Sequence, residues 1–91
     1  MEEKFLQVLE TARKKAESLG VRIRPVGEMK AAYRVLEGHR ESDGFFQLVD
    51  MGKGDLTLEA ISLKKEFASL FTDEMANAAL NRLLEAGYQF Y

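Results

Sequence analysis

A polar loop over residues 38–44 holds the side chains with the widest chemical range. His39 is the only histidine of the chain, and Ser42 and Asp43 follow it closely. Together they supply the imidazole, hydroxyl and carboxylate of a hydrolytic triad, and His39 with Glu41 and Asp43 supplies groups that bind metals. Neighbouring residues of one loop rarely converge on one atom, because working triads are assembled from separate parts of a fold. We therefore expect a solvated turn in which Ser42 or Asp43 caps the next element, and we assign no catalytic residue and no metal site.

The segment Gly52-Lys53-Gly54-Asp55 has the composition of a phosphate-binding loop but lacks its spacing. The Walker pattern places four residues between two glycines, then a lysine and a serine or threonine at the start of a helix. Asp55 would also repel a phosphate. We expect a turn with a helix cap here, and the sequence implies no nucleotide and no other cofactor.

Three arginines, Arg22, Arg24 and Arg34, lie close together in the sequence, and Arg40 can join them. If residues 21–26 and 28–37 lie side by side, the guanidinium groups form a patch that can bind a phosphate or a carboxylate. Nearby carboxylates can neutralise that patch, which favours a solvated, salt-bridged face; they are Glu28, Glu37 and Glu41. An anion-binding face at the three arginines remains the alternative.

Charge disfavours a nucleic-acid partner for the C-terminal half. The chain has a formal net charge of −2, and Arg82 is the only cation among several carboxylates in residues 73–86. Recognition of phosphates requires clustered lysine and arginine, so we do not expect residues 56–86 to act as a helix-turn-helix.

Aromatic side chains gather towards the C-terminal end of the sequence. Tyr88, Phe90 and Tyr91 follow the last predicted helix, and Phe71 precedes it. Large rigid rings dominate the energetically important positions of protein interfaces, so these four residues are the candidate partner-binding site. In a small domain the same rings can close the core, and the sequence leaves both possibilities open.

Size and composition limit the class of protein. A chain of 91 residues suffices for one domain, which we place over 1–91. It contains no cysteine, so disulfides and thiolate metal sites are excluded. No apolar run approaches the ~20 residues of a membrane span, and residues 1–15 lack the features of a signal peptide. We expect a small soluble protein of the cytoplasm.

Hydrophobic periodicity predicts helices over most of the chain. The clearest patterns cover three ranges, 2–19, 56–71 and 73–86. Gly20 is placed to end the first of these helices, and Thr72 is a favourable N-cap for the last. Gly87 should end that last helix in a Schellman motif with Tyr88.

Residues 21–26 change period. Val21 and Ile23 alternate with arginines, which is the pattern of a half-buried strand. Pro25 cannot donate a ladder hydrogen bond, so this strand should be short and lie at the edge of a sheet.

The assignment of residues 28–37 and 45–51 decides the fold class. We favour a helix for each, although each also fits a strand. The prediction is a mainly α fold: a compact bundle of four or five short helices, with a minor β element near 21–26 and a second candidate strand at 88–91. The alternative is an α+β fold with a β-hairpin in 21–50.

These observations favour a protein-interaction or accessory module without catalytic activity, whose partner is another protein or a second copy in a homodimer. The preference rests on the C-terminal aromatic residues and on the lack of a catalytic cluster. A nucleic-acid-binding or regulatory domain that uses Arg22, Arg24 and Arg34 is the second hypothesis. An enzyme centred on His39 is the third.

Overall fold

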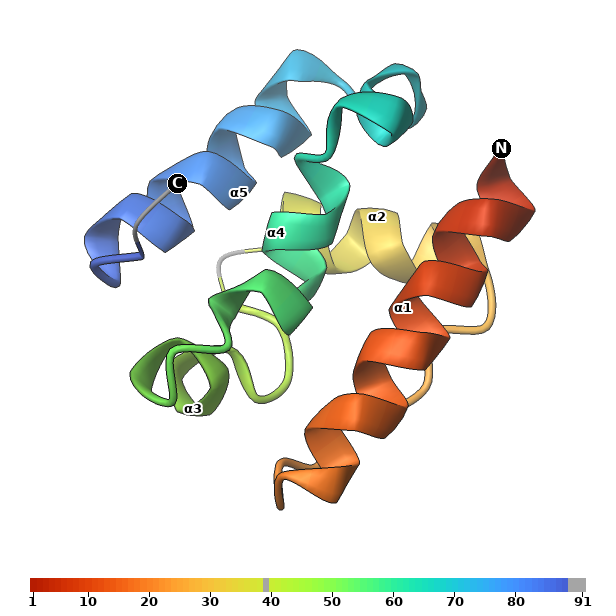
Figure 1. Cartoon of the computed structure of the whole chain (residues 1–91). Helices are drawn as coiled ribbons and strands as arrows, with labels where there is room; N and C mark the ends of the chain where they lie inside the picture. The colour runs from red at the N-terminus through yellow and green to blue at the C-terminus, as the bar shows by residue number, and fades with distance from the viewer. Residues whose placement is uncertain (39, 89–91) are drawn as a thin grey trace.

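The fold is entirely helical in the part of the chain that this computed structural model describes, residues 1–38 and 40–88. Its five α-helices are α1 (Glu2–Ser18), α2 (Met29–Glu37), α3 (Phe45–Asp50), α4 (Leu58–Ser62) and α5 (Asp73–Glu85), and its 3₁₀ helices are η1 (Gly54–Leu56) and η2 (Lys65–Leu70). The short helix α4 lies at the centre and contacts both α1 and α5, while α2 packs on α5 behind it (Figure 1). The Cα radius of gyration of 11.8 Å is that of a compact protein. The predicted mainly α fold is confirmed.

The first helix is ended by the glycine that the sequence placed there. Gly20 adopts a left-handed conformation with a φ of 88°. Its N–H donates to the carbonyl of Glu17 at 2.9 Å, and the N–H of Val21 donates to the carbonyl of Ala16 at 3.0 Å. These two bonds form a Schellman motif, which turns Val21 back into the core.

The last helix begins and ends as predicted. The hydroxyl of Thr72 accepts a hydrogen bond from the N–H of Met75 at 3.2 Å. At the other end the N–H of Tyr88 donates to the carbonyl of Leu83 at 2.9 Å, and the N–H of Gly87 donates to that of Leu84 at 3.1 Å. The predicted Schellman ending is therefore present.

The predicted strand near 21–26 is wrong. Residues 21–27 form neither helix nor strand, and no strand is formed in residues 1–38 or 40–88. The alternation that resembled a strand arises because Val21 is buried in a cluster with Ala16 and Leu48, which lie on helices, and Ile23 packs against that cluster. These two apolar side chains pack against helices, and no sheet is needed. Of the second candidate strand, 88–91, residues 89–91 lie outside the described residues.

The alternative hairpin in 21–50 is also excluded. Residues 29–37 and 45–50 are the helices α2 and α3, as the favoured interpretation of the sequence predicted. The helix α3 does not begin with a side-chain cap, because its N-cap is Gly44 in a left-handed conformation. The expectation that Ser42 or Asp43 caps this element is therefore wrong.

The single helix predicted over 56–71 is broken into three short pieces. Thr57 is extended, accepts a hydrogen bond from the N–H of Ala60 at 3.1 Å and donates its hydroxyl to the carbonyl of Gly54 at 2.7 Å. A threonine that satisfies the first amide of a helix starts a new helix at that point. Extended backbone at Lys64 then separates α4 from η2. The face buried by α4 includes Leu58, Glu59 and Ile61.

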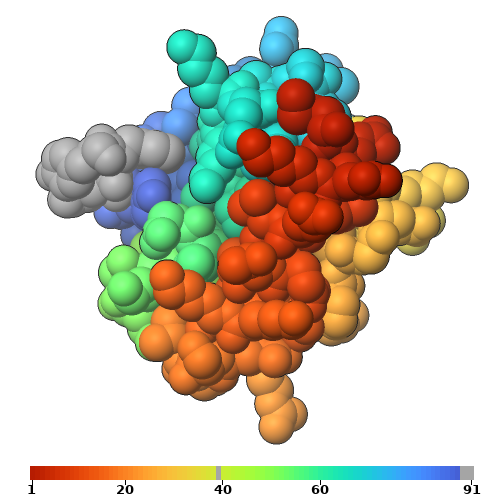
Figure 2. Space-filling view, turned by 45° about the vertical axis from the view of Figure 1, so that its right-hand side comes forward, coloured from red at the N-terminus to blue at the C-terminus, as the bar shows by residue number. Residues whose placement is uncertain are grey.

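The hydrophobic core has two clusters. The larger joins α1, α2, α4 and η2, and its centre is Phe5, whose ring lies 5.1 Å from that of Phe67 in an edge-to-face arrangement. The smaller contains Ala16, Val21 and Leu48. Leu56 packs against both clusters. Figure 2 shows α1, in red to orange, lying across one face of the molecule, with the segment that follows it along its lower and right-hand edges.

Candidate functional site

A cavity of about 850 Å³ lies between α1, residues 23–26, α2, residues 40–43 and the start of α4. Its apolar wall consists of side chains from all of these elements except the 40–43 loop: Leu9, Ile23, Pro25, Val26, Ala31, Val35, Leu56 and Leu58. Exposed residues such as Arg24 and Arg34 also line it, so the cavity opens to solvent. Its volume falls within the range of about 300–1,000 Å³ that is usual for small-molecule sites.

The cavity is placed where the two clusters of the core meet. Leu9 and Leu58 belong to the larger cluster, Ile23 packs against the smaller one, and Leu56 packs against both. The cavity is therefore an open hollow between two parts of the core, lined by side chains from both.

Two of the four arginines that line the cavity form salt bridges with carboxylates. Arg13 bonds Glu10 and, at 2.7 Å, Glu17. Arg24 donates its Nε–H to Oδ2 of Asp43 at 2.9 Å, and its backbone N–H donates to the same carboxylate at 3.2 Å. The hydrogen bond from the Arg24 side chain lowers the pKa of Asp43. The bond from Arg13 lowers the pKa of Glu10 in the same way.

The other two arginines, Arg34 and Arg40, make no salt bridge within residues 1–38 and 40–88. Arg34 lies on the last turn of α2, and Arg40 lies in the loop that follows. The carboxylate of Glu41 lines the same cavity and is likewise outside any salt bridge among these residues. Among the wall side chains that have no salt bridge within the described residues, two arginines, Arg34 and Arg40, stand against one carboxylate, Glu41.

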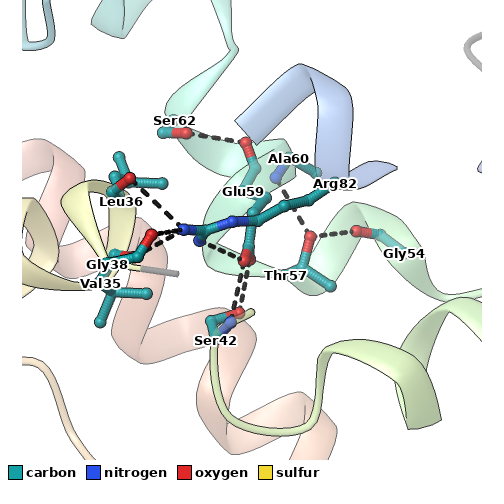
Figure 3. Close-up of polar contacts among 10 residues, drawn as sticks. All are labelled: Val35, Leu36, Gly38, Ser42, Gly54, Thr57, Glu59, Ala60, Ser62 and Arg82. Atoms are coloured by element: carbon teal, nitrogen blue, oxygen red, sulfur yellow. Dashed lines mark hydrogen bonds and ion pairs between the residues drawn. The ribbon is translucent and has the colours of Figure 1, made fainter. Parts of the chain in front are cut away.

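The loop that carries Arg40 is anchored by a buried carboxylate. Glu59 on α4 is fully buried, with 0% of its surface exposed. Its Oε2 accepts the backbone N–H of Ser42 at 2.9 Å, and its Oε1 accepts the hydroxyl of Ser42 (Figure 3). Both bonds hold Ser42 against α4, and they fix the position of residues 40–43 at the edge of the cavity.

Arg82 on α5 completes this network from the other side. Its Nη1 donates to Oε2 of Glu59 at 3.2 Å. Its Nη2 donates to the carbonyls of Val35 at 3.0 Å and Gly38 at 2.7 Å, with a longer bond to Leu36. The last carbonyls of a helix have no partner within that helix and lie at its negative end, where a cation stabilises them. Figure 3 shows the guanidinium between the end of α2 and the carboxylate, so one side chain connects three elements.

The structure brings together two of the three arginines that the sequence singled out. Arg24 and Arg34 line the cavity, whereas Arg22 is exposed and does not. The carboxylate that neutralises Arg24 is Asp43, 19 positions away, and not one of the acidic residues proposed from sequence. His39 lies outside the described residues.

Two of the four aromatic residues predicted to form a partner-binding site lie in the described part of the chain, and both pack against the fold. The ring of Phe71 lies 5.0 Å from that of Phe5 and 5.8 Å from that of Tyr33, so it contributes to the packing of the core. Tyr88 is half-buried, with its ring against Gly54 and with burial raising the pKa of its phenol. Phe90 and Tyr91 lie outside the described residues.

Ser42 and Asp43 do not face a common point. The hydroxyl of Ser42 is directed at Glu59 inside the fold, and the carboxylate of Asp43 is directed at Arg24 at the cavity wall. Among residues 1–38 and 40–88, no three carboxylates or imidazoles are grouped where they can hold a metal ion.

Sequence reasoning missed the Glu59–Arg82 pair, although each residue carried a signal. Glu59 is the only charged residue in the stretch 56–63, and Arg82 is the only cation in 73–86. A single charge within an apolar stretch is costly to bury unless it is paired. Sequence alone does not say which lone charge meets which, because these two are 23 positions apart.

Comparisons of the chain with protein-family models, with curated proteins and with solved structures found no match. In the described part of the chain, no helix has both the length and the apolar composition needed to cross a bilayer.

Proposed function

We propose that this protein is a non-catalytic binding module and that its ligand site is the cavity between α1, residues 23–26, α2 and residues 40–43. The observation that carries the proposal is the hollow of about 850 Å³ at the junction of the two core clusters. The cavity opens to solvent, and its apolar lining joins side chains from both clusters. An apolar ligand that fills it would bury this lining and be held by the hydrophobic effect.

The lining of the cavity supports a binding role. Ligand sites are mostly apolar, with a few polar groups that orient the ligand. Here leucine, isoleucine and valine side chains form the interior, and arginine side chains lie among them. The ligand is therefore expected to bury an apolar group and to place a polar group beside the arginines.

The hydrogen bonds and the salt bridge made by the loop side chains also favour a binding role over a catalytic one. Ser42 donates its hydroxyl to buried Glu59, and Asp43 pairs with Arg24. A nucleophilic serine requires a base that accepts its proton and a free path to the substrate. The hydrogen bonds of Ser42 are those of a residue that holds the loop in place.

A neutral fluorescent probe tests the proposal. N-phenyl-1-naphthylamine becomes bright in an apolar site. We expect saturable binding by the wild-type protein. The variant Ala31→Trp, which places a large ring at the cavity wall, should lose most of this binding.

The matched control is Ala68→Trp, because Ala68 is exposed and does not line the cavity. It should bind the probe like the wild type. Absence of probe binding to the wild type, or equal binding by Ala31→Trp and the wild type, would contradict the proposal. Circular dichroism of both variants verifies that each is folded.

Self-association is a second candidate function, favoured by apolar side chains at the surface. Leu84 is 55% exposed, and Leu80 lies one turn before it on the outer face of α5. Phe46 on α3 is 57% exposed. Apolar residues grouped on a surface mark sites of protein contact. The mass in solution, measured by light scattering over a range of concentrations, tests this candidate.

A further inference from the structure

Some of the arginines around the cavity form salt bridges with carboxylates of its wall, and others do not. Arg13 and Arg24 each bond a carboxylate of the wall. Arg34 and Arg40 have no such partner among residues 1–38 and 40–88. The positive charge available to a ligand is therefore concentrated at the end of α2 and in the loop that follows it.

Arginine at these two positions favours a particular head group. The guanidinium group presents its N–H donors in a planar fork that fits the two oxygens of a carboxylate. Arg34 is carried by a helix and Arg40 by a loop that Glu59 fixes through Ser42. The backbone that carries each arginine is thus held in place before binding, which reduces the conformational freedom lost when a ligand arrives.

The net positive charge at the cavity wall also indicates how many negative charges the ligand carries. Of the groups without a salt bridge at the wall, Glu41 opposes Arg34 and Arg40, which leaves one net positive charge. One anionic group balances it. A polyanion would meet the carboxylate of Glu41 and a chain with a formal net charge of −2.

We propose that the ligand of the cavity is an amphipathic monoanion: a carboxylate held by Arg34 and Arg40, attached to an apolar chain that fills the space between α1 and α2. The proposal rests on the function proposed above, which assigns the cavity as the binding site. It adds the chemical class of the ligand and the two residues that select it.

Displacement of N-phenyl-1-naphthylamine by two soluble amphiphiles tests the inference. Dodecanoate carries the expected head, and dodecyltrimethylammonium carries the same chain with the opposite charge; both are used below the concentrations at which they form micelles. We expect dodecanoate to displace the probe at a concentration about tenfold lower than dodecyltrimethylammonium. Raising the salt concentration should reduce this difference.

Variants identify the residues responsible. Arg34→Gln and Arg40→Gln should each weaken the binding of dodecanoate about fivefold relative to any change in the binding of the neutral probe. Arg22→Gln is the matched control, because Arg22 is exposed and lies outside the cavity lining. Arg22→Gln should change neither the binding of dodecanoate nor the binding of the neutral probe. Glu41→Gln should strengthen the binding of dodecanoate, since it removes a negative charge from the cavity wall.

Several outcomes would overturn the inference. One is equal displacement by the two amphiphiles, which leaves an apolar site without a selected charge. Another is a loss of affinity for dodecanoate in Arg22→Gln as large as that in Arg34→Gln, which would indicate attraction by the overall charge of the protein. A third is dodecyl phosphate binding more than tenfold tighter than dodecanoate, which contradicts a single-charge site. In each case the neutral probe still binds, whereas its failure to bind refutes the proposed function itself.

Discussion

The guanidinium of Arg82 lies 3.2 Å from the carboxylate of Glu59, with 10% of the arginine side chain and none of the glutamate side chain exposed to solvent. This contact joins α5 to α4, and each partner extends it to another part of the chain. Arg82 bonds the last carbonyls of α2, and Glu59 bonds Ser42. The pair therefore determines where the loop at the edge of the cavity lies.

Substitution of Arg82 should lower the free energy of unfolding substantially. Arg82→Met leaves the buried carboxylate of Glu59 without its cation and the end of α2 without its cap. Removal of one partner from a buried pair typically costs about 3–5 kcal/mol. Urea denaturation followed by circular dichroism measures the free energy of unfolding.

Two further variants show whether the cost comes from the pair. Arg34→Met is the control, because Arg34 is exposed and makes no salt bridge among the described residues; it should change stability by about 0.5 kcal/mol or less. The double variant Glu59→Leu, Arg82→Met should recover part of the loss, since no unpaired charge remains buried. A double variant less stable than Arg82→Met would contradict this account.

The Arg24–Asp43 pair predicts a dependence of stability on pH. The hydrogen bond from Arg24 lowers the pKa of Asp43 in the folded state. A group with a lowered pKa stabilises the fold above its unfolded pKa, about 3.9 for aspartate, and this contribution is lost as the pH falls through the folded pKa. The stability lost by Asp43→Asn should therefore be largest near neutral pH and shrink in acid. A loss that stays constant from neutral pH into acid would contradict the prediction.

A side chain at position 54 should displace the ring of Tyr88. A Cβ added to Gly54 would overlap two ring carbons of Tyr88, so one of the two must shift. Overpacking of this kind costs about 1–3 kcal/mol, and we expect Gly54→Ala to lower the thermal midpoint accordingly. Gly27→Ala is the control, since nothing lies within 4 Å of its Cβ position and its φ is not positive. It should leave stability unchanged or raise it slightly. Equal effects of the two substitutions would refute the contact.

If the protein self-associates through α5, the change Leu84→Lys should shift it towards monomer. Leu84 is exposed, so the substitution should alter the free energy of unfolding by about 0.5 kcal/mol or less. Light scattering over a range of concentrations measures the mass. A variant that keeps the wild-type mass at every concentration would exclude Leu84 from the contact. Deletion of Phe90 and Tyr91 tests in the same way whether the C-terminal aromatic residues are needed.

The features that the sequence predicted correctly are local. Helical periodicity, the N-cap at Thr72 and the glycines that end α1 and α5 each depend on residues a few positions apart. Such interactions act within one turn of a helix, and the sequence therefore contains all of the partners.

The features that the sequence did not predict depend on distant residues. The sequence predicted one helix over 56–71, whereas Thr57 caps a new helix, α4, which packs against α1 and α5. Arg82 meets Gly38, 44 positions away, and Asp43 meets Arg24, 19 positions away. The cavity combines side chains from five segments, so only the fold brings Arg34 and Arg40 to the same wall.

The most direct test of the central claim, that the cavity is the binding site, is a titration of the labelled protein with N-phenyl-1-naphthylamine followed by proton–nitrogen correlation NMR. The account predicts that the amide signals that shift belong to α1, residues 23–26, α2 and residues 40–43, around Leu9, Ala31 and Ser42. The exposed amides of α5 near Leu84 should not move. Shifts confined to α5, or no saturable shift at all, would contradict the claim.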